Sequence, residues 1–294
     1  MQYSSGQIDS GYAKALALAK NHYENFPVVS AFIPKQLRKH VAVIYWFART
    51  SDDMADNESM PALERMKLLT QFEERLQQTI AGKPLEDIDA ALLNTINEYD
   101  ISTKYLFDLL SAFKQDVIKS RYATLGEVLD YCSRSANPVG RLMLELFGLH
   151  HPETVKYSDK ICTALQLANF WQDVSLDIKK DRVYIPAAYL DKFGAEESEI
   201  IAQKHGPDSK KLRNCLRELV NLTDEMFVEG EKLLPFLEGF FKYEILWTIL
   251  GGRKVLDKIR KIDYNVHCER ISLSKTDLLK LGIESLFHGT GKRK

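Results

Sequence analysis

Four polar residues near the start of the chain, Tyr45, Arg49, Asp52 and Asp56, recur at steps of four, three and four. On a helix this spacing places all four side chains along one line, because residues three and four apart are neighbours on the helix surface. Their flanking residues are apolar, so the line falls where a buried apolar seam is expected, and Asp53 adds another acid. Buried acids need a counter-charge or a metal ion.

A second stripe of the same kind lies in the middle of the chain. Gln166, Asn169, Asp173 and Asp177 recur at steps of three, four and four, again among strongly apolar neighbours. Two acidic helical stripes in one chain predict a cavity with carboxylates on opposite walls. Carboxylates that supply only one or two ligands each, and leave room for water and phosphate, are how proteins hold Mg²⁺ against a diphosphate.

Two arginines are suited to bind such a substrate. Arg49 lies on the first stripe and Arg182 follows the second. A guanidinium group binds phosphate or carboxylate through two parallel hydrogen bonds, which favours a role in diphosphate binding. The alternative is that each arginine only neutralises a nearby aspartate.

Aromatic side chains near both stripes are suited to wall a cavity in which their π faces stabilise a carbocation. Any one of them alone is more often part of a core. The candidates are Phe26, Phe32, Tyr45, Tyr131, Phe170 and Trp171.

The composition favours one large soluble domain. The chain has 294 residues, of which 45% are hydrophobic and 28% charged, so it can bury a large core. Forty basic and 41 acidic residues give a formal net charge of −1, which argues against nucleic acid as a partner. The four cysteines are far apart, without metal-ligand spacing, so neither a zinc site nor a disulfide framework is expected.

The start of the chain has no signal-peptide pattern, and no apolar run approaches the roughly 20 residues of a membrane span. We therefore expect a cytoplasmic protein, in contact with a membrane only peripherally if at all.

Apolar spacing and capping signals predict helices throughout, with no alternating strand pattern and no repeat. The expected helices cover residues 9–25, 35–57, 61–81, 87–99, 102–122, 124–135, 152–180, 196–205, 209–234, 243–262 and 273–286. Asn137, Pro138 and Gly140 predict a kink in a further helical run that ends near residue 149. The fold class is therefore all-α, with a single domain over residues 1–294.

Both acidic stripes belong to longer motifs that resemble those of a known family. The chain has DDMAD at residues 52–56 and QLANFWQDVSLD at residues 166–177, followed by RVYIP at residues 182–186. As a pair, these resemble the two signatures of the squalene and phytoene synthase family. The resemblance implies an isoprenoid synthase bundle with a central apolar cavity, in which Mg²⁺ ions bridge a prenyl diphosphate to the protein.

The resemblance also assigns roles. The implied metal ligands are Asp52, Asp53, Asp56, Asn169, Asp173 and Asp177. The implied catalytic set is Asp52, Asp56, Asp173, Asp177 and Tyr45. The implied substrate contacts are Phe26, Arg49, Tyr131, Asn137, Gln166, Asn169, Gln172 and Arg182.

Further segments point within the family. The segments HYENFP at 22–27, ARTSDD at 48–53, SANPVG at 135–140 and NFWQD at 169–173 are similar to the bacterial hydroxysqualene synthase branch of hopanoid biosynthesis. That similarity implies conversion of presqualene diphosphate and water to hydroxysqualene and diphosphate, without NADPH. It also implies a functional partnership with a presqualene diphosphate synthase. In this branch a positioned water captures the rearranged cation, and the polar candidates to hold it are Gln172, Asn137 and Tyr131.

Two departures from the wider family favour this later step over condensation. Family members that join two prenyl diphosphates often carry AGTVG where this chain has ANPVG at residues 136–140, and arginine where it has Gln172. Condensation by a squalene- or phytoene-type synthase stays the alternative. A non-catalytic helical scaffold is a further alternative, but a scaffold has no reason to keep buried acids.

Overall fold

The computed structural model describes residues 4–21, 33–201, 209–266, 271–274 and 277. In this part of the chain all regular elements are helices, apart from one isolated bridge between Arg121 and Val183. The predicted all-α fold class is confirmed. None of the described helices combines the length and the apolar character that crossing a bilayer requires.

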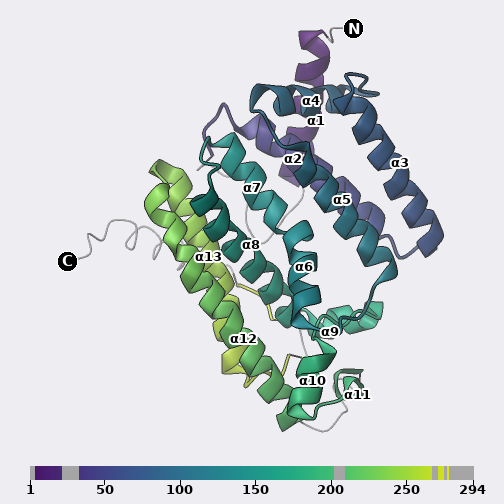
Figure 1. The fold of residues 1–294 in the computed structure, drawn as a ribbon. Coiled ribbons are helices and arrows are strands. Elements are labelled where there is room, and N and C mark those ends of the chain that lie inside the picture. Colours follow the sequence, from purple (N-terminus) through teal and green to yellow (C-terminus); the bar gives the residue numbers. More distant parts are fainter. Residues whose placement is uncertain (1–3, 22–32, 202–208, 267–270, 275–276, 278–294) are drawn as a thin grey trace. The chain divides into compact units, whose positions relative to one another are not determined.

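The chain forms two compact units, each built from two stretches of sequence. Unit 1 comprises residues 1–118 and 138–151, and unit 2 comprises residues 119–137 and 152–294. The stretches of the two units alternate along the sequence, so the chain passes from one unit to the other after residues 118, 137 and 151. Figure 1 shows the elements of both. A single domain over residues 1–294 stays a prediction.

The helices of unit 1 are α1 (Ser5–Asn21), α2 (Arg38–Ala55), α3 (Ala62–Ile80), α4 (Asp87–Glu98), α5 (Thr103–Ile118) and most of α7 (Asn137–Leu146). Unit 2 contains α6 (Leu125–Ser135), α8 (Pro152–Gln172), α9 (Val174–Asp177), η1 (Ile178–Lys180), α10 (Ala187–Phe193), α11 (Glu197–Ile201), α12 (Lys210–Gly230), η3 (Glu231–Phe236) and α13 (Gly239–Lys261).

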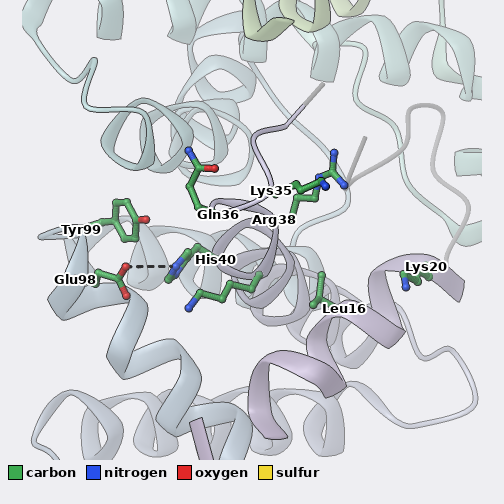
Figure 2. A pocket seen from close by; sticks show the side chains of 9 residues that line it. Leu16, Lys20, Lys35, Gln36, Arg38, His40, Glu98 and Tyr99 are labelled. Atoms are coloured by element: carbon green, nitrogen blue, oxygen red, sulfur yellow. Dashed lines mark ion pairs between the residues drawn. The ribbon is translucent and has the colours of Figure 1, made fainter. Parts of the chain in front are cut away.

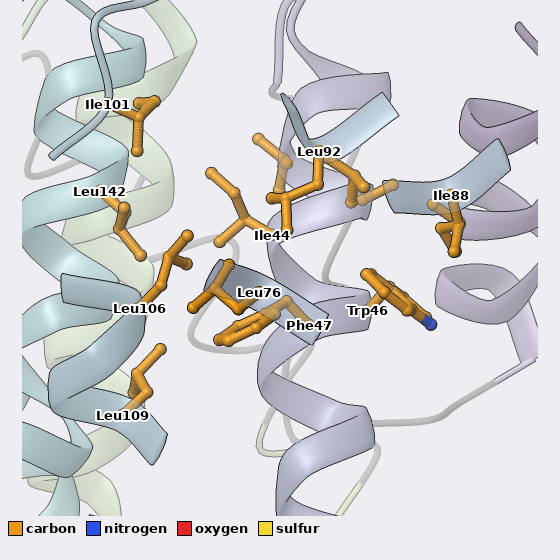
Figure 3. Packing of buried hydrophobic residues seen from close by; sticks show 14 of the residues in the cluster. Ile44, Trp46, Phe47, Leu76, Ile88, Leu92, Ile101, Leu106, Leu109 and Leu142 are labelled. Atoms are coloured by element: carbon orange, nitrogen blue, oxygen red, sulfur yellow. The ribbon is translucent and has the colours of Figure 1, made fainter. Parts of the chain in front are cut away.

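Helix α2 is the centre of unit 1, because it contacts α1, α3, α4 and α5. Figure 3 shows its residues Ile44, Trp46 and Phe47 among apolar side chains of α3, α4, α5 and α7. The ring of Phe47 stacks on Phe72 of α3 with centroids 5.2 Å apart, and Trp46 meets the same ring edge-on at 5.9 Å. This packing fixes the rotation of α2 and therefore the face on which its acids lie.

A buried polar network joins α1, α2 and α4 in unit 1. The His40 Nδ1 atom lies 3.1 Å from the Tyr12 hydroxyl and 2.9 Å from Thr95 Oγ1. The groups around the ring are Lys39 on the same helix, Tyr12 on α1, and Glu98 and Tyr99 at the end of α4. Burial lowers the pKa of His40 to about 4, with Glu98 raising it and Lys39 lowering it further.

This shift predicts acid sensitivity. Because the pKa of His40 is lower in the folded than in the unfolded chain, the unfolded chain binds more protons between pH 6.5 and about 4, and stability falls as the pH falls through this window. We expect His40 to account for about 2 kcal/mol of the unfolding free energy lost between pH 7 and pH 5. Denaturant unfolding at both pH values measures it.

The His40→Gln variant tests this prediction. It should lose less stability than the wild type over the same pH interval, because it lacks the group whose pKa differs between the folded and unfolded chains. An unchanged pH dependence in His40→Gln would contradict the assignment.

In unit 2, helix α8 lies side by side with α12 and α13 (Figure 1). The buried indole of Trp171 donates a hydrogen bond of 2.9 Å to Thr223 Oγ1 on α12. Helix α13 packs closely against both neighbours at Gly252, where a Cβ atom would lie 2.3 Å from the ring of Phe227 on α12 and 3.0 Å from Leu165 on α8. These contacts fix α8, which carries the second acidic motif.

Several predicted helix bounds are wrong. The expected helix over residues 152–180 ends at Gln172 and restarts at Val174, and the helix over 102–122 ends at Ile118, so that residues 119–123 are extended. The helix over 209–234 becomes a 3₁₀-helix at Glu231, near Pro235. Helix α10 was not predicted. The predicted helix over 273–286 falls mainly outside the described residues.

Candidate active site

The first acidic motif occupies the last turn of α2 and the residue after it. Tyr45, Arg49, Asp52 and Asp56 are all half-buried, and the side chain of Asp53 is 52% exposed. The four-residue line predicted from the spacing is therefore confirmed as helical, but its side chains are not fully buried. Half-buried carboxylates keep access to water and ligands, which a metal site needs.

Contacts around the end of α2 fix the position of these acids. The Arg65 side chain on α3 donates a 2.6 Å hydrogen bond to the Ala55 carbonyl, and the Asp56 amide donates to the Asp52 carbonyl at 2.9 Å. Arg49 Nη2 lies 2.7 Å from Asp53 Oδ1. The expected alternative role of Arg49, neutralising a nearby aspartate, is thus present in the structure, with Asp53 as its partner.

The second acidic motif also lies at the carboxyl end of a long helix. Helix α8 breaks at Asp173, whose amide donates to the Asn169 carbonyl at 2.9 Å, and the Asp177 amide donates to the Asp173 carbonyl at 2.8 Å. Gln166, Asp173 and Asp177 are half-buried and Asn169 is exposed. The break gives Asp177 a direction that one continuous helix would not.

The end of α2 makes the first motif electrostatically unfavourable without a cation. The carboxyl end of a helix carries a partial negative charge, and basic residues in the last turn normally offset it. The last turn of α2 has no basic residue and contains Asp52 and Asp53. The second motif differs, because Asp173 follows α8 and Asp177 lies in the first turn of α9. The helix-end charge therefore favours cation binding at the first motif.

The structure brings Asp177 and Arg182 together. The Arg182 amide donates a 2.9 Å hydrogen bond to the Asp177 carbonyl, which closes the turn after η1. Asp181 makes this turn possible by adopting a left-handed backbone with φ of 55°. Asp177 and Arg182 line one small cavity, together with Phe170 and Tyr184. A carboxylate and a guanidinium thus share one wall in unit 2.

Arg121 fixes the position of this turn through its side chain, and no sequence pattern predicted that role. Its guanidinium donates to the Asp181 backbone carbonyl, to Asp181 Oδ1 at 2.7 Å and to Glu197 Oε1 at 2.8 Å. The Val183 amide donates to the Ser120 carbonyl at 2.9 Å. The Arg121 side chain and the Val183 amide therefore tie Asp181 and the segment after it to residues 119–123.

An aromatic cluster holds the same segment against α8. The rings of Phe170 and Tyr184 stack with centroids 3.7 Å apart and an interplanar angle of 7°. Tyr122 stacks on Tyr184 at 5.6 Å, and Tyr131 lies 6.0 Å from Phe170. Tyr131, a predicted substrate contact, is therefore a buried member of this cluster. The cluster therefore holds the segment that carries Arg182 against the end of α8.

The polar candidates for holding a water differ in their surroundings. Gln172 is buried, and its Nε2 atom donates to the Ile271 carbonyl at 2.6 Å, while its Oε1 atom has no hydrogen-bond partner. Asn137 is also buried, and its Oδ1 atom accepts a hydrogen bond of 2.9 Å from Thr163. Phe26 lies outside the described residues. Gln172 thus retains a buried acceptor.

The donor chemistry of both motifs fits Mg²⁺. Within the described ranges no three His, Cys, Asp or Glu side chains form a group that could hold a metal ion. Mg²⁺ does not require one, because it is usually bound by one or two carboxylates together with water and substrate phosphate. Carboxylate and amide oxygens are the donors in both motifs, and such hard ligands suit Mg²⁺.

Comparison with known proteins adds independent evidence. The squalene/phytoene synthase family model matches residues 19–277. A hydroxysqualene synthase from Sinorhizobium fredii is 31% identical over 278 residues, covering 94% of this chain and 92% of that protein. One from Rhodopseudomonas palustris is 35% identical over 231 residues, covering 78% and 76%.

Solved structures agree with this assignment. The crystal structure of squalene synthase HpnC from Alicyclobacillus acidocaldarius matches with a TM-score of 0.83 at 34% identity, covering 89% of this chain and 97% of that one. The family model extends over parts of both units and includes both acidic motifs and Arg182. This chain therefore belongs to the squalene/phytoene synthase family.

Proposed function

We propose that this protein converts presqualene diphosphate and water into hydroxysqualene and diphosphate, with Mg²⁺ as its metal. The observation that carries the proposal is the pair of intact acidic motifs in a chain more than 30% identical to two hydroxysqualene synthases. The placement of Asp52 and Asp53 in the last turn of α2, which has no basic residue, supports it.

The proposed Mg²⁺ ligands come from the two acidic motifs. Asp52 and Asp56 of α2, with Asp53 beside them, would hold Mg²⁺ at the first motif, and Asn169, Asp173 and Asp177 would hold it at the second. Mg²⁺ would supply charge neutralisation for the leaving diphosphate oxygens.

The remaining side chains bind the diphosphate or shield the carbocation from water. Arg182, Arg49 and Tyr45 orient the diphosphate, with Gln166 supporting the second motif. When the diphosphate binds, the Arg49 guanidinium leaves Asp53 and binds a diphosphate oxygen instead. When the carbon–oxygen bond to diphosphate breaks, apolar and aromatic walls keep bulk water away from the carbocation. The free Oε1 atom of Gln172 supports a role in accepting a hydrogen bond from the one water that attacks.

Product analysis tests the proposal. Purified protein incubated with presqualene diphosphate, Mg²⁺ and ¹⁸O-labelled water should yield hydroxysqualene carrying the label, because the hydroxyl oxygen comes from the attacking water. The yield should not change when NADPH is added, and mass spectrometry of the extracted product measures both. A squalene product that requires NADPH would contradict this function.

The same assay separates the alternatives. Turnover of farnesyl or geranylgeranyl diphosphate alone would indicate a condensing synthase, and binding of Mg²⁺ and diphosphate without any turnover would indicate a scaffold. The proposed reaction needs a presqualene diphosphate synthase to supply its substrate. It also places the protein in the cytoplasm, with peripheral access to membrane-dissolved isoprenoids.

A further inference from the structure

A second cavity, of about 620 Å³, lies in unit 1 at the amino end of α2. Figure 2 shows its lining side chains, which come from α1, from the turn before α2, from α2 itself and from the end of α4. They are Leu16, Lys20, Lys35, Gln36, Arg38, Lys39, His40, Glu98 and Tyr99. We refer to it as the basic cavity.

Four of the lining residues are basic and only one, Glu98, is acidic. Lys20 and Lys35 are exposed, and neither forms an ion pair or hydrogen bond within the described residues. Lys39 is held with its ammonium group 4.7 Å from the centre of the Tyr12 ring. Lys20 and Lys35 therefore add positive charge to the basic cavity that no described residue offsets.

Part of the basic cavity is rigidly built. Arg38 is anchored by a 2.9 Å hydrogen bond from its Nε atom to the Ile33 carbonyl. The side chain of His40 is 1% exposed and fixed by Tyr12 and Thr95, and its Nε2 atom has no hydrogen-bond partner. The carboxylate of Glu98 lies 3.7 Å from this Nε2 atom, so the imidazole forms a fixed wall of the basic cavity and the anion-binding groups are the lysines and Arg38.

The basic cavity is separate from the acidic motif on the same helix. Asp52 follows Lys39 by thirteen residues, which corresponds to roughly 20 Å along a helix. A ligand bound at the basic cavity is therefore not the diphosphate held by Asp52 and Asp56. The opposite ends of α2 carry opposite charge and favour different ligands.

We propose that the basic cavity docks the protein on a membrane surface by binding the headgroup phosphates of anionic phospholipids. The choice of a membrane rests on the proposed function, because a long isoprenoid substrate dissolves in the bilayer and no described helix crosses it. Exposed lysines on the rim reach a surface without rearrangement. Each basic residue at an anionic membrane surface strengthens binding by about fivefold.

Vesicle co-sedimentation of the full chain tests this proposal. The protein should bind vesicles of phosphatidylcholine with phosphatidylglycerol, and not vesicles of phosphatidylcholine alone, with binding that weakens as salt rises. Lys20→Glu combined with Lys35→Glu should lower the partition coefficient at least about 25-fold. These two lysines have no ion-pair or hydrogen-bond partner among the described residues, so the double variant should keep its melting temperature.

The matched control is the double variant Lys67→Glu and Lys83→Glu, which changes the net charge equally at exposed positions elsewhere in unit 1. Equal loss of binding in the control, or no binding by the wild type, would overturn the proposal. Binding of inorganic phosphate at the basic cavity, measured by calorimetry, in a protein that does not bind vesicles would also overturn the proposal. Vesicle binding is measured without substrate, so failure of the proposed reaction would leave this result unaffected.

Discussion

Asp52→Asn and Asp173→Asn are each expected to lower turnover of presqualene diphosphate by at least about a thousandfold. Each change keeps the shape of the side chain and removes the negative charge that binds Mg²⁺. Charge stabilisation by a metal on a leaving oxygen contributes several kcal/mol, and about 4 kcal/mol corresponds to a thousandfold in rate. Single-turnover kinetics at saturating Mg²⁺ measure the loss.

The folds of both variants should be retained, because the two aspartates are half-buried and a change to asparagine leaves no cavity. Glu64→Gln on α3 and Glu153→Gln on α8 are the controls, since both are exposed acids near helix starts. They should keep wild-type turnover. If either aspartate variant retained more than a tenth of the activity, the metal assignment would be wrong for that residue.

A second large effect on kcat/KM is expected from substitution of Arg121, a residue that does not contact the substrate in the proposed function. Arg121→Gln removes the charged hydrogen bonds to Asp181 and Glu197, so the left-handed turn loses its anchor and Arg182 loses its fixed position. Loss of such supporting contacts typically costs 10- to 100-fold in affinity or activity. We expect about this loss in kcat/KM, with a raised KM for presqualene diphosphate.

A purely structural role would instead lower stability without changing diphosphate affinity. Calorimetry with Mg²⁺ and diphosphate separates the two cases, because weaker binding at an unchanged melting temperature indicates mispositioning. Arg121→Lys should recover part of the affinity, since it keeps the charge but not the geometry. Arg134→Gln, which loses a pair with Asp130 on the surface of α6, is the control. Unchanged affinity in Arg121→Gln would refute its positioning role.

The sequence was sufficient to predict the helical elements that carry the chemistry. The steps of three and four at Asp52 and at Asp173 depend only on helix geometry. The first motif lies on α2 as expected, whereas the second runs from α8 across the break at Asp173 into α9. Helix α10 was not predicted, although the sequence contains the signals of a helix start and end. Pro186 precedes its first residue, and Gly194, with φ of 63°, ends it.

Other features were not predictable from local patterns. The break at Asp173 has neither glycine nor proline to announce it. The role of Arg121 depends on partners 60 and 76 residues away, and no spacing rule connects residues at such distances. The approach of the two acidic motifs to one another also depends on tertiary packing, so it stays a prediction.

The alternation of the two units along the chain has a consequence for synthesis on the ribosome. Unit 1 is completed only by α7, which supplies the buried Leu142 and, through Glu145, a carboxylate that accepts a 3.1 Å hydrogen bond from the Ser102 amide. These residues emerge after the whole of α6, which belongs to the other unit. In the nascent chain the apolar face of α5 therefore stays exposed while residues 119–137 of the other unit are translated. A chaperone can bind this exposed apolar face during that period.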